Sequence, residues 1–403
     1  MQLVTVDRIQ AARELLAGVI RETPMEHSRM LSAEQGGEVF LKCENLQRTG
    51  SFKIRGAYVR IHGLSPSDRA RGVVAASAGN HAQGVALAAA TLNITSTVYM
   101  PVQVPLPKLA ATRGYGANVH LYGNVIEETL AEAQAYAYRA GAVFIHPFDH
   151  PDVIAGQGTL GLEIVDQLPD AATVVVPTGG GGLAGGVAAA IKGVRPDIRV
   201  VAVQAEQAAA FPPSLLAGGP VRLAELQTMA DGIAVGQPGH VSYAHVDELV
   251  DDVVTVTEES LSRAVLLCLE RAKQVVEPAG AASVAALLQY PKRFPGPVVA
   301  VLSGGNVDPV LLLQIIQHGM TAGGRYLALR LRIPDRPGSL AALLKRVSDL
   351  GANVLDVEHS RVSGALRLGE ADVALDLETR GLEHCARVTE ALHAAGYVVL
   401  ERR

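Results

Sequence analysis

The segment Ser51-Phe52-Lys53-Ile54-Arg55-Gly56-Ala57 places a lysine between an aromatic and a β-branched side chain. If such a lysine is buried, it must pair with a carboxylate or lose its charge, because desolvation lowers the pKa of the amine. The neutral amine is a nucleophile toward carbonyl groups. The pattern therefore makes Lys53 a candidate for covalent catalysis at the start of a helix, although a solvated surface lysine would show the same local pattern.

A turn of small residues, Ser77-Ala78-Gly79-Asn80-His81-Ala82-Gln83-Gly84, follows an expected strand that ends at Ala75. Backbone N–H groups at the start of a helix can point outward and hold a carboxylate or a phosphate. The side-chain amide of Asn80 can also reach a ring oxygen. This turn alone is equally compatible with a plain capped connection between a strand and a helix.

A glycine-rich loop, Pro177-Thr178-Gly179-Gly180-Gly181-Gly182-Leu183-Ala184-Gly185-Gly186, opens another expected helix. Four successive glycines cost chain entropy, so we expect a ligand to approach this backbone closely, and phosphate is the natural candidate. The loop also satisfies the dinucleotide pattern through Gly180, Gly182 and Gly185, with Glu206 placed as a ribose ligand would be. An NAD(P)-dependent oxidoreductase is therefore an alternative, but it leaves Lys53 without a function.

The last such loop is Ser303-Gly304-Gly305-Asn306, directly after an apolar strand. The hydroxyl of Ser303 could meet a ring nitrogen, or it could be an ordinary helix cap. We expect no metal site, because His146 and His150 are separated by Pro147 and no H-E-x-x-H pattern is present. Together, the amine, the amide, the phosphate loop and the hydroxyl are the groups needed to hold pyridoxal 5'-phosphate.

Short β-branched runs alternate with alanine-rich helical stretches over residues 5–318. This rhythm predicts an α/β fold with parallel-rich twisted sheets covered by helices on both faces. Ligand-binding loops then belong at the carboxyl ends of the strands. The expected strands are 72–75, 96–100, 173–176, 199–203 and 297–302.

Composition narrows the classes of partner. A net charge of −5 and 4% aromatic residues argue against nucleic acid. No stretch of roughly 18 residues lacks polar side chains, so we expect no membrane association. Three widely spaced cysteines, Cys43, Cys268 and Cys385, suggest unpaired thiols in a reducing cytoplasm.

A change of pattern near residue 319 divides the chain. We expect a catalytic domain over 1–318, with a smaller subdomain at roughly 50–150, then a flexible glycine-containing linker over 319–325. Residues 326–403 predict a second domain with the element order βαββαβ. A unit this small usually pairs with another copy, so we expect a homodimer or homotetramer.

These motifs together resemble the threonine ammonia-lyase (threonine dehydratase) family of fold-type II pyridoxal-phosphate enzymes, essentially from end to end. The segments S-F-K-I-R-G-A, S-A-G-N-H-A-Q-G, G-G-G-G-L and S-G-G-N occur in the family's order, with 152–159 and 276–280 between them. The resemblance implies that Lys53, beside Phe52, binds the cofactor covalently, that Asn80 contacts its 3-oxygen and that Ser303 faces the pyridine nitrogen. It assigns the cofactor phosphate to Gly179, Gly180, Gly181 and Gly182. It assigns the substrate carboxylate to the turn that includes Ser77, Ala78, Gly79 and His81.

The resemblance also implies the reaction, conversion of L-threonine to 2-oxobutanoate and ammonia by β-elimination. Activity on L-serine should accompany it, because one methyl group is worth only about 1–3 kcal/mol of discrimination. Serine racemases of the family carry S-S-G-N-H where this chain has Ala78, so we expect elimination without racemisation. A racemase-like enzyme and a non-catalytic amino-acid sensor are further alternatives. The stretch 204–210 departs from the racemases' acidic cation site, which argues against activation by magnesium.

The C-terminal segment resembles an ACT domain, with the stretch 335–340 in the position of that domain's ligand turn. Gly338, Ser339 and Asn353 are the implied regulatory residues, with isoleucine or valine as the effector. This suggests feedback control in isoleucine biosynthesis. The alternative is that the domain only dimerises.

Overall fold

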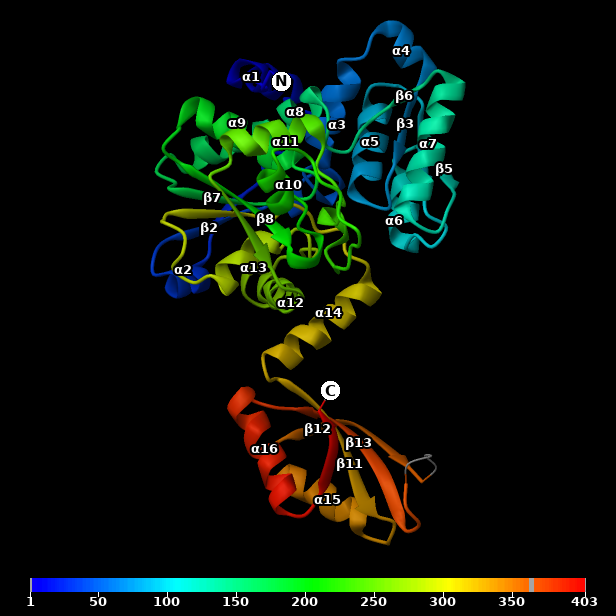
Figure 1. Cartoon of the computed structure of the whole chain (residues 1–403), viewed down its shortest axis with the longest axis vertical. Helices are drawn as coiled ribbons and strands as arrows, with labels where there is room; N and C mark the ends of the chain where they lie inside the picture. The colour runs from blue at the N-terminus through cyan, green and yellow to red at the C-terminus, as the bar shows by residue number, and fades with distance from the viewer. Residues whose placement is uncertain (1, 362–365, 403) are drawn as a thin grey trace. The chain divides into compact units, whose positions relative to one another are not determined.

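The computed structural model describes residues 2–361 and 366–402. It divides into two compact units, Met1–Leu312 and Leu313–Arg403 (Figure 1). The first unit contains two open sheets with helices packed on them, and the second contains an antiparallel sheet with two helices. The predicted fold class is therefore confirmed.

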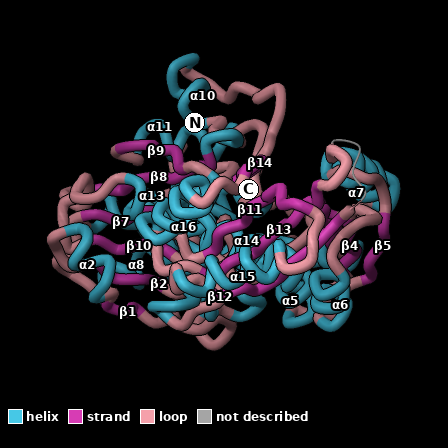
Figure 2. Tube along the Cα trace, turned by 90° about the horizontal axis from the view of Figure 1, so that it is seen from below, coloured by secondary structure: helices cyan, strands magenta, loops and turns pink. Residues whose placement is uncertain are grey.

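The larger sheet of the first unit has the strand order β1-β2-β10-β7-β8-β9, and Figure 2 shows these strands side by side. Only β1 is antiparallel to its neighbour, as expected for a parallel-rich sheet. The valine-rich runs of β7 and β10 are buried along their whole length, which explains their lack of alternating polar residues. The strands are β1 (Met25–His27), β2 (Val39–Lys42), β7 (Thr173–Pro177), β8 (Arg199–Ala205), β9 (Asp252–Val256) and β10 (Val298–Val301).

The smaller sheet has the order β5-β4-β3-β6, and all of its pairs are parallel. It lies within the range 50–150 in which we expected a subdomain. Its strands are β3 (Val73–Ala76), β4 (Ser96–Met100), β5 (Asn118–Leu121) and β6 (Val143–Phe144).

Helices cover both faces of the larger sheet. α9 and α13 contact its central strands from opposite sides (Figure 1). The helices of this unit are α1 (Val6–Leu16), α2 (Arg29–Gln35), α3 (Lys53–His62), α4 (Pro66–Arg71), α5 (Asn80–Thr91), α6 (Leu106–Gly114), α7 (Ile126–Ala140), α8 (Pro151–Gln167), α9 (Gly182–Val194), α10 (Phe211–Ala217), α11 (His240–Leu249), α12 (Glu258–Leu267) and α13 (Ala282–Gln289).

The second unit has the expected order βαββαβ and a sheet of order β12-β13-β11-β14. Alternate residues of β11 are buried, and they pack with α15 and α16 in one apolar core. The elements are β11 (Tyr326–Pro334), α15 (Ser339–Asp349), β12 (Asn353–Ser360), β13 (Glu370–Glu378), α16 (Leu382–Ala394) and β14 (Val398–Arg402).

The structure differs from the linker expected over 319–325. Helix α14 (Pro309–Ala322) runs through the first four of these residues, and glycine in its last turn is tolerated because the helical bonds continue. Gly324 adopts a left-handed φ of 66°, and its carbonyl accepts hydrogen bonds from Gly381 N (2.9 Å) and Thr379 Oγ1 (2.7 Å). The glycines of this segment therefore lie at the end of a helix, and Gly324 accepts hydrogen bonds from other residues of the second unit.

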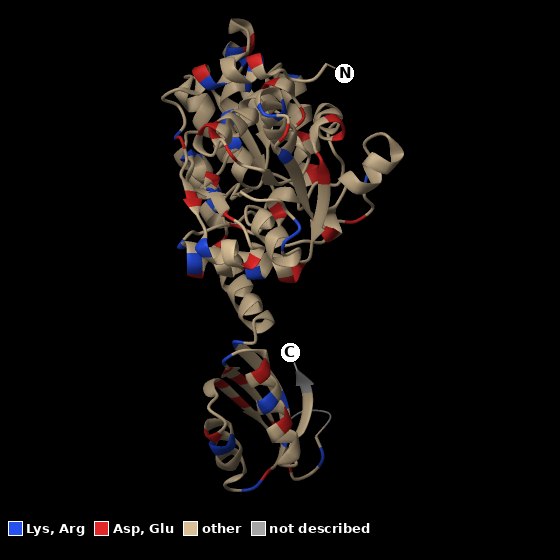
Figure 3. Cartoon of the chain, turned by 90° about the vertical axis from the view of Figure 1, so that its left-hand side faces the viewer, with Lys and Arg blue, Asp and Glu red and all other residues tan. Residues whose placement is uncertain are grey.

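Acidic and basic residues are interspersed along the ribbon that Figure 3 shows. No helix in the described part of the chain is both long and apolar enough to cross a membrane. The cysteines Cys43, Cys268 and Cys385 are buried and unpaired, as predicted.

A buried ionic network fixes the first turns of α3. Arg55 donates to Glu44 (2.7 and 2.9 Å) and to Glu163 (2.7 Å), and Lys42 also donates to Glu163 (2.7 Å). The side chains of Arg55, Glu44 and Lys42 are 0% exposed. Two cations and two carboxylates balance in charge, so the network joins α3 to β2 and α8 without a net buried charge.

Replacing Glu163 with alanine should destabilise the protein by about 3–5 kcal/mol, because both Arg55 and Lys42 lose a buried partner. The midpoint of urea unfolding followed by circular dichroism measures this effect. Asp197→Ala breaks the exposed pair with Arg195 and should leave the midpoint nearly unchanged. Equal midpoint shifts in the two variants would contradict the importance of the network.

Candidate active site

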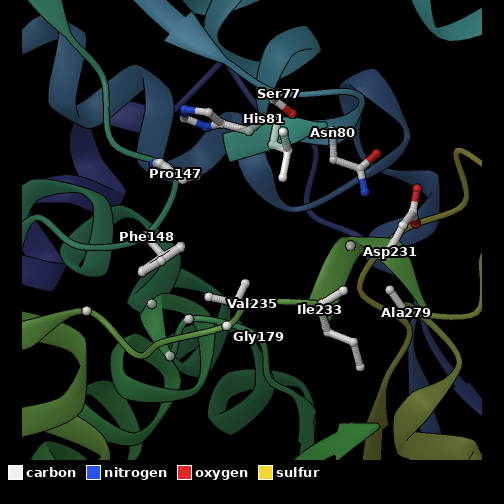
Figure 4. A pocket seen from close by; sticks show the side chains of 18 of the residues that line it. Ser77, Asn80, His81, Pro147, Phe148, Gly179, Asp231, Ile233, Val235 and Ala279 are labelled. Atoms are coloured by element: carbon white, nitrogen blue, oxygen red, sulfur yellow. The ribbon is translucent and has the colours of Figure 1, made fainter. Parts of the chain in front are cut away.

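A cavity of about 1370 Å³ lies in the first unit, and residues from both of its sheets line it (Figure 4). The loops that follow β3, β7 and β10 all open into this cavity, as expected for the carboxyl ends of parallel strands. The sequence-predicted residues that line it are Phe52, Lys53, Ser77, Ala78, Gly79, Asn80, His81, Gly179, Gly180, Gly181, Gly182 and Ser303.

Lys53 begins α3, and its Nζ donates a hydrogen bond to the carbonyl of Pro147 (3.1 Å). The amine also lies 5.1 Å from the centre of the Phe52 ring. Burial lowers the pKa of Lys53 to about 8, and the negative charge of Glu277 opposes this shift only in part. A substantial fraction of the amine is therefore neutral just above physiological pH.

The glycine loop between β7 and α9 presents unused donors. Within residues 2–361 and 366–402, the N–H groups of Gly179 to Gly182 donate to no protein acceptor. Gly181 has a φ of +96°, and a Cβ on Gly180 would lie 2.4 Å from the ring of Phe148. The glycines are therefore required partly by the packing of protein side chains, and the N–H groups that they expose can bind an anion.

The segment 147–149 ties this loop to Lys53. Phe148 packs against Gly180, and Asp149 accepts hydrogen bonds from the N–H groups of Val241 (2.7 Å) and Ser242 (3.0 Å) at the start of α11. Because Pro147 in the same segment accepts from Lys53, one short stretch of chain positions both the amine and the glycine loop. The sequence analysis did not identify Phe148 or Asp149.

The turn before α5 is held by its own polar side chains. Gly79 N donates to Ser77 Oγ (3.1 Å), and His81 Nε2 lies 2.8 Å from the carbonyl of Ile145. Burial lowers the pKa of His81 to about 3, so its ring is neutral and donates Nε2–H to that carbonyl. The imidazole thus anchors the turn, and the backbone of the turn is left to receive an anion.

Ser303 is 4% exposed and follows β10. Its carbonyl accepts from Phe52 N (3.2 Å), which fixes it relative to the start of α3. Its hydroxyl lines the cavity and has no hydrogen-bond partner in the described part of the chain. This donor is therefore available to a ligand.

Charged residues that the sequence analysis did not select also line the cavity, among them Glu277, Lys108 and Asp231. Glu277 Oε1 accepts from Asn80 Nδ2 (2.5 Å), and Lys108 Nζ pairs with Asp231 Oδ2 (2.9 Å). Glu277 belongs to the segment 276–280 noted in the sequence, but nothing in the sequence indicates that it contacts Asn80.

The predicted regulatory residues lie in the second unit, and they do not meet within one chain. Gly338 and Ser339 begin α15, whereas Asn353 follows that helix and begins β12. An 11-residue helix is about 16 Å long, which exceeds the size of a small amino acid. Asn353 Nδ2 instead donates to Oε2 of Glu378 (3.2 Å), its neighbour on the adjacent strand β13.

Comparison with known proteins gives a consistent picture. The family model described as pyridoxal-phosphate dependent enzyme matches residues 16–304. The L-threonine ammonia-lyase of Thermotoga maritima is 47% identical over 397 residues, which cover 98% of this chain and 99% of the relative. The catabolic L-threonine dehydratase TdcB of Escherichia coli K12 is 45% identical over 317 residues, or 77% of this chain and 96% of the relative.

Solved structures agree with this match. A threonine deaminase described as from T.th. superposes with a TM-score of 0.72 at 40% identity, covering 75% of this chain and 99% of that chain. The serine racemase of maize has a TM-score of 0.73 at 35% identity, covering 78% of this chain and 97% of that chain. The likeness therefore extends to enzymes described as carrying out two different reactions.

Proposed function

The chain belongs to the family of pyridoxal-phosphate dependent enzymes, and we propose that it is an L-threonine ammonia-lyase, which converts L-threonine to 2-oxobutanoate and ammonia. One observation carries the proposal: a desolvated lysine, a turn that can bind an anion and a row of free N–H groups line the same cavity. The dehydrogenase alternative gives Lys53 no function. L-Serine should be a second substrate, because it differs from threonine by one methyl group.

The residues of the cavity fit pyridoxal phosphate. The N–H groups of Gly179 to Gly182 suit its phosphate, and the unpartnered hydroxyl of Ser303 suits its pyridine nitrogen. When bound, the cofactor supplies an aldehyde that reacts with amines and a ring that accepts electrons from the substrate. A neutral hydroxyl favours ring protonation less than a carboxylate would, which suits rapid elimination.

Lys53 has two functions in this proposal. It would hold the cofactor covalently, and its Nζ, when free, would remove the proton from Cα of the substrate. A lowered amine pKa of about 8 serves both steps, because the neutral form is both the nucleophile and the base. The carbonyl of Pro147, which also lines the cavity, holds Nζ in place.

The turn before α5 would bind the substrate carboxylate through its backbone, which leaves Ala78 beside the substrate. Alanine has no group that could protonate Cα from the face opposite Lys53. We therefore assign elimination, without racemisation, to this site.

Lys53→Ala should lower keto acid production from L-threonine by at least about 10³-fold, because the variant loses both the covalent link and the base. It should also lose the near-visible absorbance of a bound cofactor that borohydride abolishes. Lys345→Ala, at an exposed site in the second unit, is the control. Wild-type turnover in Lys53→Ala would refute the assigned function.

Chiral chromatography during turnover tests the absence of racemisation. Wild-type enzyme should form keto acid from L-serine without accumulating D-serine, because Ala78 carries no proton donor. Ala78→Ser introduces a hydroxyl at this position and should allow some D-serine to form. D-serine formation by the wild type at a rate near that of keto acid formation would contradict the proposal.

For the second unit we propose a regulatory function, with isoleucine or valine bound at the turn formed by Gly338 and Ser339. The left-handed φ of 87° at Gly338 exposes backbone at the start of α15 to a ligand. Because Asn353 lies beyond the other end of that helix, it would contact the effector only from a second copy of the chain. A homo-oligomer, in the reducing cytoplasm that three free thiols suggest, follows from this proposal.

Isothermal titration of the full chain should show saturable heat with L-isoleucine or L-valine. Gly338→Val should remove the heat, because a branched side chain fills the ligand turn, and Asn353→Ala should weaken binding. Glycine serves as the control ligand. If neither branched amino acid produces heat with the full chain, the second unit has no such regulatory function.

A further inference from the structure

The polar residues behind the cavity wall form a chain of hydrogen bonds that ends at Asn80. We propose that Glu277 and Asn306 are positioning residues that fix the side-chain amide of Asn80, so that it offers only an N–H to the 3-oxygen of the bound cofactor. This inference rests on the proposed function, because it concerns the same cofactor. It assigns functions to two residues that lie within the segments 276–280 and 303–306 but to which the sequence analysis gave no role.

The direction of each amide follows from chemistry alone. Asn306 lies 2.6 Å from the carbonyl of Thr49, which can only accept, so the atom of Asn306 at that contact must be Nδ2. The same Nδ2 lies 2.7 Å from Asn80, so the Asn80 atom facing it must be the acceptor Oδ1. Asn80 Nδ2 then faces Glu277 Oε1 at 2.5 Å, where a carboxylate accepts. The contacts to Asn306 and to Glu277 require the same orientation of Asn80.

This orientation determines what Asn80 can offer to the cavity. An amide group has two N–H donors on Nδ2, and Glu277 takes one of them. The second N–H remains for a ligand, while Oδ1 is held on Asn306. An anionic 3-oxygen would therefore meet a donor, and the repulsive approach of Oδ1 is prevented.

Glu277 is held rigidly enough to serve as this anchor. It is 3% exposed, its N–H donates to the carbonyl of Gly304 (3.1 Å) and its carbonyl accepts from Ala281 N (2.9 Å). A Cβ on Gly304 would lie 2.3 Å from Glu277 Oε1 and 3.1 Å from Asn80 Nδ2. Glycine at 304 therefore leaves the space in which this contact forms, next to Ser303.

Charged groups around Glu277 make the arrangement sensitive to pH. Burial and the negative charge of Asp231 raise the pKa of Glu277 to about 7, while the Asn80 hydrogen bond and the positive charges of Lys108 and Lys53 oppose the shift. Glu277 loses its carboxyl proton as the pH rises through this value, and both of its oxygens can then accept hydrogen bonds. The hold on Asn80 should therefore be strongest above about pH 7.

The test is a pH titration of the absorbance of the bound cofactor, and the quantity compared between variants is its midpoint. Replacing a residue with a purely structural function would not shift this midpoint. An N–H on the 3-oxygen favours its anionic form, so losing that donor should raise the midpoint by about one pH unit. Asn80→Ala gives the reference shift. Asn306→Ala, which changes no charge, should shift the midpoint in the same direction.

Two variants of Glu277 separate its charge from its hydrogen bond. Glu277→Gln and Glu277→Ala both lack the charge, but only glutamine can still accept from Asn80. The midpoint of Glu277→Ala should therefore lie about one pH unit above that of Glu277→Gln. Glu248→Gln on the exposed face of α11 makes the same charge change away from the cavity and should match the wild type.

The outcomes are decisive for this inference alone. Equal midpoints in the two Glu277 variants, together with a wild-type midpoint in Asn306→Ala, would overturn it, as would an unshifted midpoint in Asn80→Ala. If Glu277→Ala does not fold, the Asn306→Ala midpoint decides. In each of these cases, loss of turnover in Lys53→Ala would still support the proposed function. Failure of this inference is therefore distinguished from failure of the proposed function.

Discussion

The ionic network of Arg55, Glu44, Glu163 and Lys42 is the constraint on which the active site depends. Charges buried this deeply are tolerated only when each has a partner in good geometry, so the network permits one placement of α3 against β2 and α8. Lys53 is the first residue of that helix. The backbone position of Lys53, the proposed catalytic residue, is therefore set by charges two residues further along the chain, and the carbonyl of Pro147 in the cavity holds its Nζ.

Arg55, which is buried, and Lys53, which is half-buried, also show how partners determine the charge of a cation. Both lie in the first turn of α3, but residues two apart point to different sides of a helix. Burial acts to lower the pKa of Arg55, but two carboxylates outweigh it and hold that pKa above the usual value. Lys53 faces a carbonyl, and in the described part of the chain no carboxylate forms an ion pair with it, so burial lowers its pKa. One turn of helix thus contains one cation whose charge is held by carboxylates and one whose charge is more easily lost.

Much of this site could be predicted from the sequence, because loops after parallel strands converge on one edge of a sheet. Gly179 and Ser303 follow strands of the larger sheet and meet for that reason, whereas Ser77 follows the smaller sheet and lines the same cavity through the packing of the two sheets. The contact between Asn80 and Glu277 joins residues 197 positions apart, and no local pattern encodes it. The sequence analysis explained the four successive glycines only by the close approach of a ligand. They also make room for the ring of Phe148, and the position of that ring depends on tertiary packing.

The two sheets of the first unit contribute different parts of the cavity. The turn before α5 follows the smaller sheet, and the glycine loop and Ser303 follow the larger one. Lys108 from α6 and Asp231 form an ion pair between these parts, and Asp231 is half-exposed. A pair with so much solvent access contributes about 1 kcal/mol or less. The Lys108–Asp231 pair is therefore a weak contact between the two parts of the cavity, whereas the partly buried hydrogen bonds of Asn80 to Glu277 and Asn306 join the same parts.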